Sequence, residues 1–403
     1  MKTYIHRDLE PVLRSMLKQF PAVALTGPRQ AGKSTLLQYA LPTARYLTLD
    51  DPVLRQRALD DPELMLGADD QQLIIDEIQY APTLLSYIKI RIDKNRAAKG
   101  CFILTGSQQF ALMKNLVESL AGRIGLLELL PFGVAEAARA GASSEALAAF
   151  SRACLRGSFP EPLVDRQVDV ARWYAAYVQT YLERDIRTVY DIGNLREFER
   201  FLQLLAARCA QELHLSTLAA DVGVAVNTIK KWVSILEACR IIYLLPPYYR
   251  NLGKRIIKAP KVYFMDIGMV CYLTGLRDKD HLLNGPLSGP LFENFCIQEA
   301  LKVLLSRGVP PRLYFLRTQN GLEVDLLVEG INGRLCPFEF KLSRTPRPSM
   351  GDALTSFREQ FKTLRPEPGG LVTLSAATGP LTRDVQLCSL EVFLSAIKSL
   401  AHV

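Results

Sequence analysis

The sequence predicts an α/β fold whose first part is a parallel sheet flanked by helices. Short apolar runs at 22–26, 73–77 and 101–107 alternate with helical patterns, which is typical of parallel sheets. Residues 132–210 have a wholly helical pattern, and a second α/β pattern begins after residue 290. A chain of 403 residues is expected to form two to four domains. The predicted domains are 1–135, 136–210, 211–284 and 285–403.

The composition indicates a globular protein, with 49% hydrophobic and 22% charged residues. No apolar run is long enough to span a bilayer, so we expect no membrane segment. Charged residues stand where a secretion signal would have its apolar core, which favours a cytoplasmic location. The eight scattered cysteines form no C-x-x-C pair, which argues against a structural zinc site. A net charge of +8 permits nucleic-acid contact without establishing it.

The strongest motif is G-x-x-x-x-G-K-S at 27–34, the pattern of a phosphate-binding loop. It follows the apolar run 22–26 and precedes a helical pattern that ends before Pro42. A strand, a glycine-bearing loop and a helix N-terminus direct N–H dipoles at one point, which suits a polyphosphate. We expect Lys33 to reach the β- and γ-phosphates and the Ser34 hydroxyl to ligate Mg²⁺. The expected nucleotide contacts are Gly27, Pro28, Arg29, Gln30, Ala31, Gly32, Lys33, Ser34 and Thr35.

The strand predicted at 73–77 ends in two carboxylates and is the expected partner of the loop. Asp76 would hold Mg²⁺, and Glu77 would orient the attacking water. The next strand ends at Ser107, which could sense the γ-phosphate or form an ordinary turn. Arg123 could act as an arginine finger, although a surface ion pair is the favoured interpretation.

An aromatic stripe at helical spacing, from Trp173 to Leu182, is expected to pack in the core of the helical region. A helix-turn-helix follows, with its turn at Gly223 and Asn227 as the cap of its second helix. Two strands after it can pair as the wing of a winged helix. The lysines and arginines expected to contact nucleic acid are Lys230, Lys231, Lys254, Arg255 and Lys258, with Arg250 and Lys261 in the same basic stretch. A rigid spacer or a protein-binding face is the alternative function for this domain.

A linker is predicted at 285–290, followed by a helix that carries Glu293 on an apolar face. Asp325 and Glu339 lie on two strands joined around Gly333. A three-residue loop with Gly333 in the left-handed conformation would place Asp325 opposite Glu339, with Lys341 on the same face. Glu293, Asp325 and Glu339 could then hold a metal ion for phosphodiester hydrolysis. The same residues could instead form a structural ion-pair cluster, and the sequence leaves both interpretations open.

The chain resembles a bacterial and archaeal family of AAA-type ATPases from about residue 5 to 345. The phrases that carry the resemblance are Gly27-Pro28-Arg29-Gln30, Ile75-Asp76-Glu77-Ile78-Gln79, Leu104-Thr105-Gly106-Ser107, Leu120-Ala121-Gly122-Arg123, Lys254-Arg255, Phe264-Met265-Asp266-Ile267-Gly268, Phe292-Glu293-Asn294 and Glu323-Val324-Asp325. The resemblance implies a P-loop ATPase domain, a winged helix and a C-terminal domain similar to PD-(D/E)XK nucleases, with Val324 in place of the proline of that motif. It also implies that the nucleotide is ATP.

We therefore expect a Mg²⁺-dependent ATPase whose nucleotide state controls the winged-helix and nuclease-like domains. Its catalytic residues would be Lys33 and Glu77, with Asp325, Glu339 and Lys341 in the C-terminal domain. Nucleic acid is the expected partner, and a protein partner or a homo-oligomer is compatible with the sequence. The alternatives are an ATP-gated metal-dependent nuclease and a nucleotide-switched scaffold that binds a protein.

Overall fold

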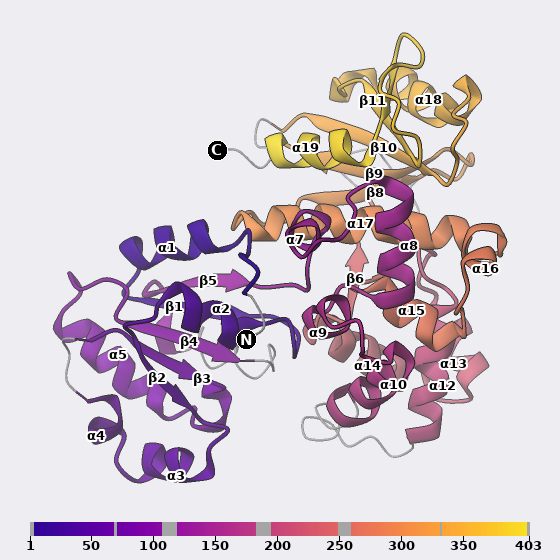
Figure 1. The fold of residues 1–403 in the computed structure, drawn as a ribbon. Coiled ribbons are helices and arrows are strands. Elements are labelled where there is room, and N and C mark those ends of the chain that lie inside the picture. Colours follow the sequence, from indigo (N-terminus) through magenta and orange to yellow (C-terminus); the bar gives the residue numbers. More distant parts are fainter. Residues whose placement is uncertain are drawn as a thin grey trace. The chain divides into compact units, whose positions relative to one another are not determined.

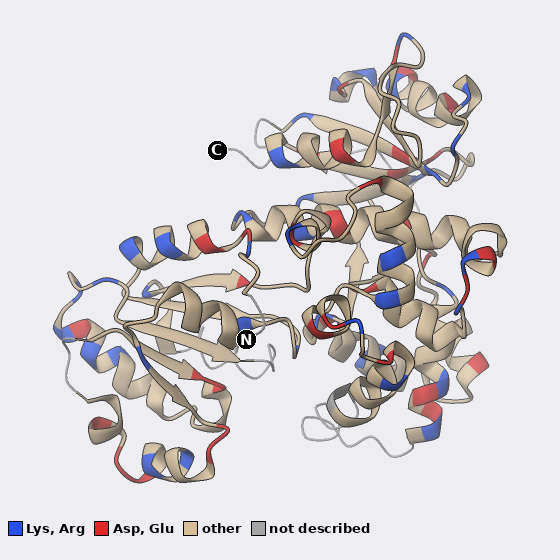
Figure 2. Cartoon of the chain, in the orientation of Figure 1, with Lys and Arg blue, Asp and Glu red and all other residues tan. Residues whose placement is uncertain are grey.

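The computed structural model describes residues 4–67, 71–106, 119–182, 195–248, 259–330 and 333–400. The chain divides into two compact units (Figure 1). The first unit comprises Met1–Phe132 with the short segments Ala238–Arg240 and Leu305–Gly308, and the second comprises the remainder. No helix among the described residues combines the length and the hydropathy needed to cross a bilayer. Basic and acidic residues are interspersed along both units (Figure 2).

The first unit is built on a five-stranded parallel sheet of order β2-β3-β4-β1-β5, which confirms the predicted parallel sheet. Its elements are α1 (Glu10–Gln19), β1 (Ala22–Thr26), α2 (Lys33–Ala40), β2 (Arg45–Thr48), α3 (Pro52–Asp60), α4 (Pro62–Leu66), β3 (Leu73–Asp76), η1 (Ile78–Tyr80), α5 (Leu84–Lys94), β4 (Phe102–Gly106) and β5 (Ile124–Glu128). Strand β4 lies between β1 and β3, so the carboxyl ends of these three strands share one edge of the sheet.

Alternate residues of β1 pack on opposite faces of this sheet, as the two-residue repeat of a strand requires. Val23 and Leu25 belong to the core formed with α1 and α2. Ala22 and Ala24 belong to the core formed with α3, α4 and α5. The sheet is therefore covered by helices on both faces, which leaves its carboxyl edge available for polar groups.

The second unit begins with helices, as the pattern predicts, and continues into a helix-turn-helix with a two-stranded sheet. Its first elements are α7 (Val134–Arg139), α8 (Ala146–Arg156), α9 (Pro160–Val164), α10 (Val170–Tyr177), η2 (Val178–Leu182), α12 (Leu195–Ala206), α13 (Leu215–Val222), α14 (Val226–Ala238), β6 (Ile242–Leu245), β7 (Lys261–Phe264), α15 (Ile267–Thr274) and α16 (Lys279–Asn284). Tyr174 and Tyr177 are buried, and Trp173 stacks on Tyr177, so residues 173–177 of the aromatic stripe pack in the core as expected.

The second unit ends in a six-stranded mixed sheet of order β12-β13-β11-β10-β9-β8. Its elements are α17 (Ser288–Ser306), β8 (Leu313–Arg317), β9 (Glu323–Glu329), β10 (Leu335–Lys341), η3 (Pro348–Gly351), α18 (Asp352–Gln360), η4 (Lys362–Leu364), β11 (Gly369–Thr373), β12 (Gly379–Pro380), β13 (Val385–Cys388) and α19 (Leu390–Leu400). The chain reverses twice from β8 to β10, and β10, β11 and β13 then run parallel.

Two local predictions differ from the structure. Helix α17 begins at Ser288, so the segment predicted as a linker already contributes its last three residues to a helix. Helix α14 begins at Val226, so Asn227 lies within its first turn and does not precede it as a cap. Glycine, proline and asparagine are compatible both with the first turn of a helix and with the turn before it. The predicted starts of α14 and α17 were misplaced for that reason.

Candidate functional site

The segment between β1 and α2 is a loop that bends at two glycines. Gly27 has a φ of 139°, and a Cβ there would lie 2.1 Å from the carbonyl oxygen of Leu129. Gly32 has a φ of 92° and is the residue from which α2 begins. Both positions require glycine, because a side chain would clash or strain the backbone. The loop therefore delivers the backbone to the N-terminus of α2, where free N–H groups favour an anion.

Lys33 opens α2, and its side chain turns back over the loop. Its Nζ donates hydrogen bonds of 3.0 Å to the carbonyl oxygens of both Gly27 and Pro28, and the residue is buried. The ammonium is thus held against the same loop whose N–H groups would bind phosphate. This placement brings the predicted lysine and the predicted cradle together.

Asp76 is buried at the end of β3 and accepts hydrogen bonds from three hydroxyl groups. Ser34 Oγ donates to Asp76 Oδ2 at 2.7 Å, and Tyr46 also donates to this oxygen. Thr105, at the end of the neighbouring strand β4, donates to Asp76 Oδ1. Burial and the adjacent carboxylate raise the pKa of Tyr46 above its ordinary value. The loop and the acidic strand therefore meet at one point, as predicted.

Tyr46 and Thr105 were not singled out from the sequence as site residues. Both lie at or near the carboxyl ends of β2 and β4, the two strands that flank β3. A polar residue at that edge was the available signal, because parallel strands end on the same side of a sheet. The strand order needed to use this signal is set by distant pairing and cannot be read locally.

Glu77 adopts a left-handed backbone conformation, with a φ of 57°. Its N–H donates to Thr105 Oγ1 at 3.3 Å, and Gln79 Nε2 donates to its carboxylate. A left-handed residue other than glycine costs about 1 kcal/mol or more, and such strain concentrates at functional sites. This geometry fixes Glu77 beside Asp76, and its proposed role as the residue that orients water stays a prediction.

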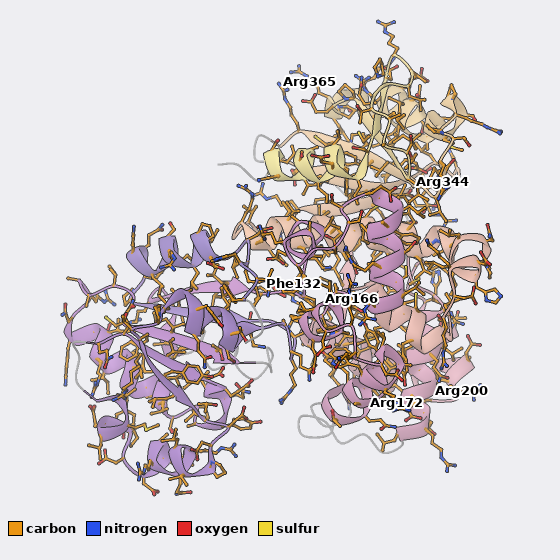
Figure 3. The ribbon with its side chains drawn as sticks, viewed as in Figure 1. Phe132, Arg166, Arg172, Arg200, Arg344 and Arg365 are labelled. Atoms are coloured by element: carbon orange, nitrogen blue, oxygen red, sulfur yellow. The ribbon has the colours of Figure 1, made fainter. Side chains whose placement is uncertain are left out.

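Arg7 is a buried residue that sequence reasoning missed. Its Nη1 donates to the carbonyl of Ala31 at 2.8 Å, and its Nη2 donates to the carbonyl of Leu130 at 2.6 Å. Its guanidinium also lies 4.7 Å from the ring centroid of Phe132, which is labelled in Figure 3. An arginine ahead of the first helix thus links the loop residue Ala31 to Leu130, which follows β5.

Arg123 is not part of this site. It precedes β5 at the amino edge of the sheet, where its carbonyl accepts from Ala22 N, whereas the loop follows the carboxyl end of β1. Its guanidinium pairs with both carboxylate oxygens of Asp93 at 2.8 and 3.0 Å. The surface ion pair favoured from the sequence is confirmed, and Arg123 does not contact its own chain's loop. Ser107 lies outside the described residues.

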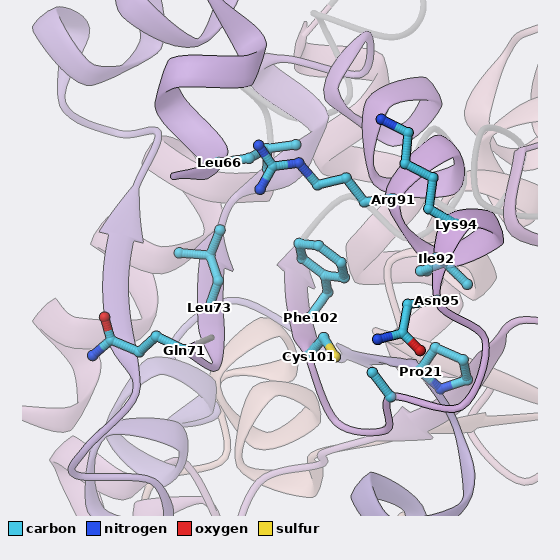
Figure 4. Close-up of a pocket in the computed structure, with 11 residues that line it drawn as sticks. Pro21, Leu66, Gln71, Leu73, Arg91, Ile92, Lys94, Asn95, Cys101 and Phe102 are labelled. Carbon is cyan, nitrogen blue, oxygen red and sulfur yellow. The ribbon is translucent and has the colours of Figure 1, made fainter. Parts of the chain in front are cut away.

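A pocket of about 60 Å³ lies at the amino ends of β3 and β4 (Figure 4). Leu73 and Phe102, the first residues of these strands, line it together with Arg91. It is several-fold smaller than the pockets that usually hold drug-sized ligands. It also lies at the opposite sheet edge from Asp76, so it is separate from the glycine loop and the acidic strand.

In the second unit, the predicted pairing of β9 with β10 is confirmed. Leu326 pairs with Phe338, and the next step of this antiparallel ladder places Asp325 opposite Glu339. Gly333 has a φ of 72°, the left-handed conformation expected for it. Asp325 Oδ2 accepts from Phe340 N at 3.0 Å, and Lys341 Nζ donates to Glu339 Oε1 at 2.5 Å. The predicted residues therefore do converge.

A second lysine enters this cluster from β7. Lys261 Nζ lies 2.7 Å from Glu323 Oε1, 3.0 Å from Glu293 Oε1 and 4.0 Å from Asp325 Oδ1. Burial lowers the pKa of Lys261, but Glu293, Asp325 and Glu323 outweigh it, so the pKa is raised above its ordinary value. Lys261 was grouped with the exposed basic stretch from its sequence neighbours. That interpretation is wrong, because only 3% of the residue is exposed.

This lysine changes the interpretation of the predicted metal ligands. Glu293 is held by Lys261 and by the hydroxyl of Tyr263, which donates at 2.5 Å. Among the described residues, no three histidines, cysteines or carboxylates are arranged to hold a metal ion. Lys261 and Lys341 pair with these three carboxylates, as in the ion-pair cluster that was the alternative interpretation. The role of Glu293, Asp325 and Glu339 as metal ligands stays a prediction.

Helix α14 presents two of the predicted nucleic-acid residues. Lys230 and Lys231 are exposed, while Ile229 and Trp232 on the same helix are buried. The second helix of the helix-turn-helix thus has the inward and outward faces that its pattern predicts. Lys254, Arg255 and Lys258 lie outside the described residues.

Three protein-family models match the chain. A model described as an AAA domain matches residues 19–138, and two described as domains of unknown function, DUF8612 and DUF4143, match residues 147–280 and 288–393. The AAA match spans both the glycine loop and the acidic strand. The first unit therefore has an AAA-type, ATPase-like fold.

Two curated mycobacterial proteins are similar over most of the chain. The uncharacterized proteins Rv2008c of Mycobacterium tuberculosis and Mb2031c of Mycobacterium bovis are each 33% identical over 353 residues. The match covers 87% of this chain and 76% of each relative. Among solved structures, the Walker-type ATPase paby2304 of Pyrococcus abyssi aligns with 16% identity and a TM-score of 0.40, over 66% of this chain and 94% of that chain.

Proposed function

Because the chain belongs to the family of Rv2008c and Mb2031c and carries an AAA domain, we propose that it binds and hydrolyses ATP in the presence of Mg²⁺. The observation that carries this proposal is the 2.7 Å hydrogen bond between Ser34 Oγ and Asp76 Oδ2. A hydroxyl and a carboxylate meet there beside the Lys33 ammonium, and this is the donor set that Mg²⁺ and a polyphosphate need.

Each residue of the proposed site has a role that follows from its chemistry. The N–H groups of the loop and the Lys33 ammonium would bind the β- and γ-phosphates and hold them in one orientation. Ser34 and Asp76 would hold Mg²⁺, which when bound would neutralise negative charge on the phosphates. Glu77 would accept a hydrogen bond from the attacking water, and its fixed backbone would keep the carboxylate in place.

The test is phosphate release by the Lys33→Ala protein. Removing the ammonium deletes a positive charge aimed at the transferred phosphoryl group, so turnover should fall by about a hundredfold or more. The matched control is Lys18→Ala on α1, an exposed lysine in the same unit, which should leave turnover unchanged. Equal rates for Lys33→Ala and the native protein would reject the proposed site.

We further propose that nucleic acid is the partner and that it binds the outer face of α14. The exposed lysine pair Lys230 and Lys231 supports this, because exposed lysines on the second helix of a helix-turn-helix can contact phosphates. The nucleotide state of the first unit would then control this binding.

Duplex DNA binding measured at several salt concentrations tests this partner. Replacing Lys230 and Lys231 by glutamate should weaken binding and reduce the slope of log affinity against log salt by about two. The control replaces Lys362 and Lys398, two exposed lysines elsewhere in the second unit, with the same change of charge. If both double variants lose affinity equally, only net charge matters and α14 is not the binding surface.

A further inference from the structure

The Lys261 ammonium joins two parts of the second unit that are distant in sequence. Lys261 lies on β7, which pairs with β6 after the helix-turn-helix, whereas its carboxylate partners lie on α17 and β9. The side chain of Asn294, next to Glu293, donates to and accepts from the backbone of Phe264 at 2.7 and 2.8 Å. The lysine is thus set in a contact that neighbouring polar groups reinforce.

The acidic cluster requires a cation. Asp325 and Glu339 are buried, Glu293 is half-buried beside them, and Glu323 completes the group at its edge. Glu339 Oε2 has no hydrogen-bond partner among the described residues, although it is removed from solvent. Buried carboxylates are strongly disfavoured without compensating charge. Lys341 pairs with Glu339, Arg317 pairs with Glu323, and Lys261 lies against Glu293, Glu323 and Asp325, so three cations face four carboxylates.

Several oxygen ligands converging from a helix and a strand would otherwise suit a hard divalent cation. An ammonium that donates to two carboxylates at 2.7 and 3.0 Å places positive charge at the same point, with one charge where a divalent ion would bring two. It is also covalently tethered, so its effective concentration at the cluster is high and independent of free metal. A divalent ion could bind here only by displacing the Lys261 ammonium or by binding next to it, where the two positive charges would repel each other.

We propose that the Lys261 ammonium is a built-in cation that takes the place of a divalent metal ion in this cluster and holds the β6–β7 hairpin on the C-terminal sheet. This goes beyond ATP hydrolysis, because it assigns a function to residues of the second unit. The segment after β6 also contacts the sheet where Tyr248 N donates to Phe315 O at 2.8 Å. Lys261 therefore adds an ionic contact to an existing backbone contact between the two parts. The cluster is therefore metal-free while Lys261 is in place.

The experiment measures Mn²⁺ binding to the full chain without nucleotide, by electron paramagnetic resonance of the free ion. Lys261→Met keeps much of the side-chain volume and removes the charge. It should gain one Mn²⁺ equivalent that binds at least tenfold more tightly than any site of the native protein, and Asp325→Asn in the same chain should remove this gain. Lys261→Arg, which keeps the charge, should not gain the site.

The matched control is Lys302→Met. Lys302 is also buried and also ion-paired, with Glu299 Oε1 of its own helix at 2.8 Å, and it lies outside the Lys261 cluster. It should gain no Mn²⁺. A folded Lys261→Met protein without additional Mn²⁺, or an equal gain in Lys302→Met, would overturn the proposal.

The native protein supplies a test that does not depend on the folding of Lys261→Met. Mn²⁺ bound by the native chain and lost in Asp325→Asn would show that the cluster accepts metal beside Lys261, which overturns the proposal. Identical Mn²⁺ binding by these two proteins supports it. ATP turnover is not measured in either comparison, so failure here is separate from failure of the proposed ATPase.

Discussion

Glu339 and Glu293 show how burial and neighbouring charge compete at single residues. Burial raises the pKa of Glu339 to about 8, and Asp325 adds to this rise while Lys341 opposes it. Burial raises the pKa of Glu293 to about 7, with Lys261 opposing it and Asp325 adding to it. Both carboxyl groups therefore bind protons in the folded protein at pH values where the unfolded chain has lost them.

This difference predicts how stability depends on pH. Between about pH 5 and pH 8 the folded state binds more protons than the unfolded state, so the free energy of unfolding falls as pH rises. The Tm of the native protein should therefore decrease across this range, and Glu339→Gln should decrease less because it no longer titrates. Thermal unfolding at four pH values checks this.

The control for this prediction is Glu367→Gln, which removes an exposed carboxylate from a surface ion pair with Arg334. It should leave the slope of Tm against pH unchanged. If Glu339→Gln has the same slope as the native protein, Glu339 does not titrate in this range.

Residues whose role follows from local pattern were predictable, and residues whose partners are distant were not. Lys33 and Asp76 were predicted because Lys33 belongs to the loop motif and Asp76 ends an apolar strand, and both patterns can be recognised within a few residues. Lys261 was misplaced because its partners Glu293 and Glu323 lie 32 and 62 positions away, and sequence neighbours suggested an exposed basic stretch. Arg7 was missed for the same reason, since it contacts Ala31 and Leu130.

Among the elements, helix α15 is positioned by its cap, Asp266. This buried carboxylate accepts from Met269 N at 2.9 Å within the helix and from Ser158 N at 2.7 Å in the turn after α8. Tyr174 of α10 also donates its hydroxyl to Asp266. One carboxylate thus ties together α8, α10 and α15, and each donor would be buried and unsatisfied without it.

We therefore expect Asp266→Ala to destabilise the second unit by about 2–4 kcal/mol, because a cap and several buried hydrogen bonds are lost together. The comparison is Asp278→Ala, which removes the exposed cap of α16, where Asp278 Oδ1 accepts from His281 N at 2.9 Å. That change should cost much less, because this cap is exposed to solvent. Urea unfolding of both variants measures the difference, and similar losses would contradict the linking role of Asp266.

The β9–β10 pairing was predictable at the scale of elements because it depends on the turn. A left-handed Gly333 selects a three-residue connection, and that connection fixes which side chains face each other. The start of α14 was not predictable, since Val226 and Asn227 are both acceptable in the first turn and packing decides between them.

For the whole molecule, the division into two units places the proposed nucleotide site and the acidic cluster in different units. All described residues of the proposed nucleotide site belong to the first unit, and the Lys261 cluster belongs to the second. The four domains predicted from the sequence were separated where the pattern of helices and strands changes, for example at 285–290. Long-range pairs such as Lys261 with Glu293 instead join the helix-turn-helix to the C-terminal sheet within one unit.

Calorimetry with Mg²⁺ and ADP should reveal this separation. A ligand at one hundred times its Kd stabilises the part that binds it by about 2.7 kcal/mol. The transition of the first unit should therefore move to higher temperature, while that of the second stays in place. Lys33→Ala should show a smaller movement because its phosphate contacts are weakened. Equal movement of both transitions would mean that the units unfold as one.

The bond from Arg7 to Ala31 has a practical meaning for anyone who shortens this protein. Trimming the segment ahead of α1 removes no part of the glycine motif, yet it leaves the Ala31 and Leu130 carbonyls without their guanidinium donor. If such a shortened protein binds nucleotide poorly, the cause would be the loss of the Arg7 hydrogen bonds to these carbonyls. The result would not show that the loop was wrongly assigned.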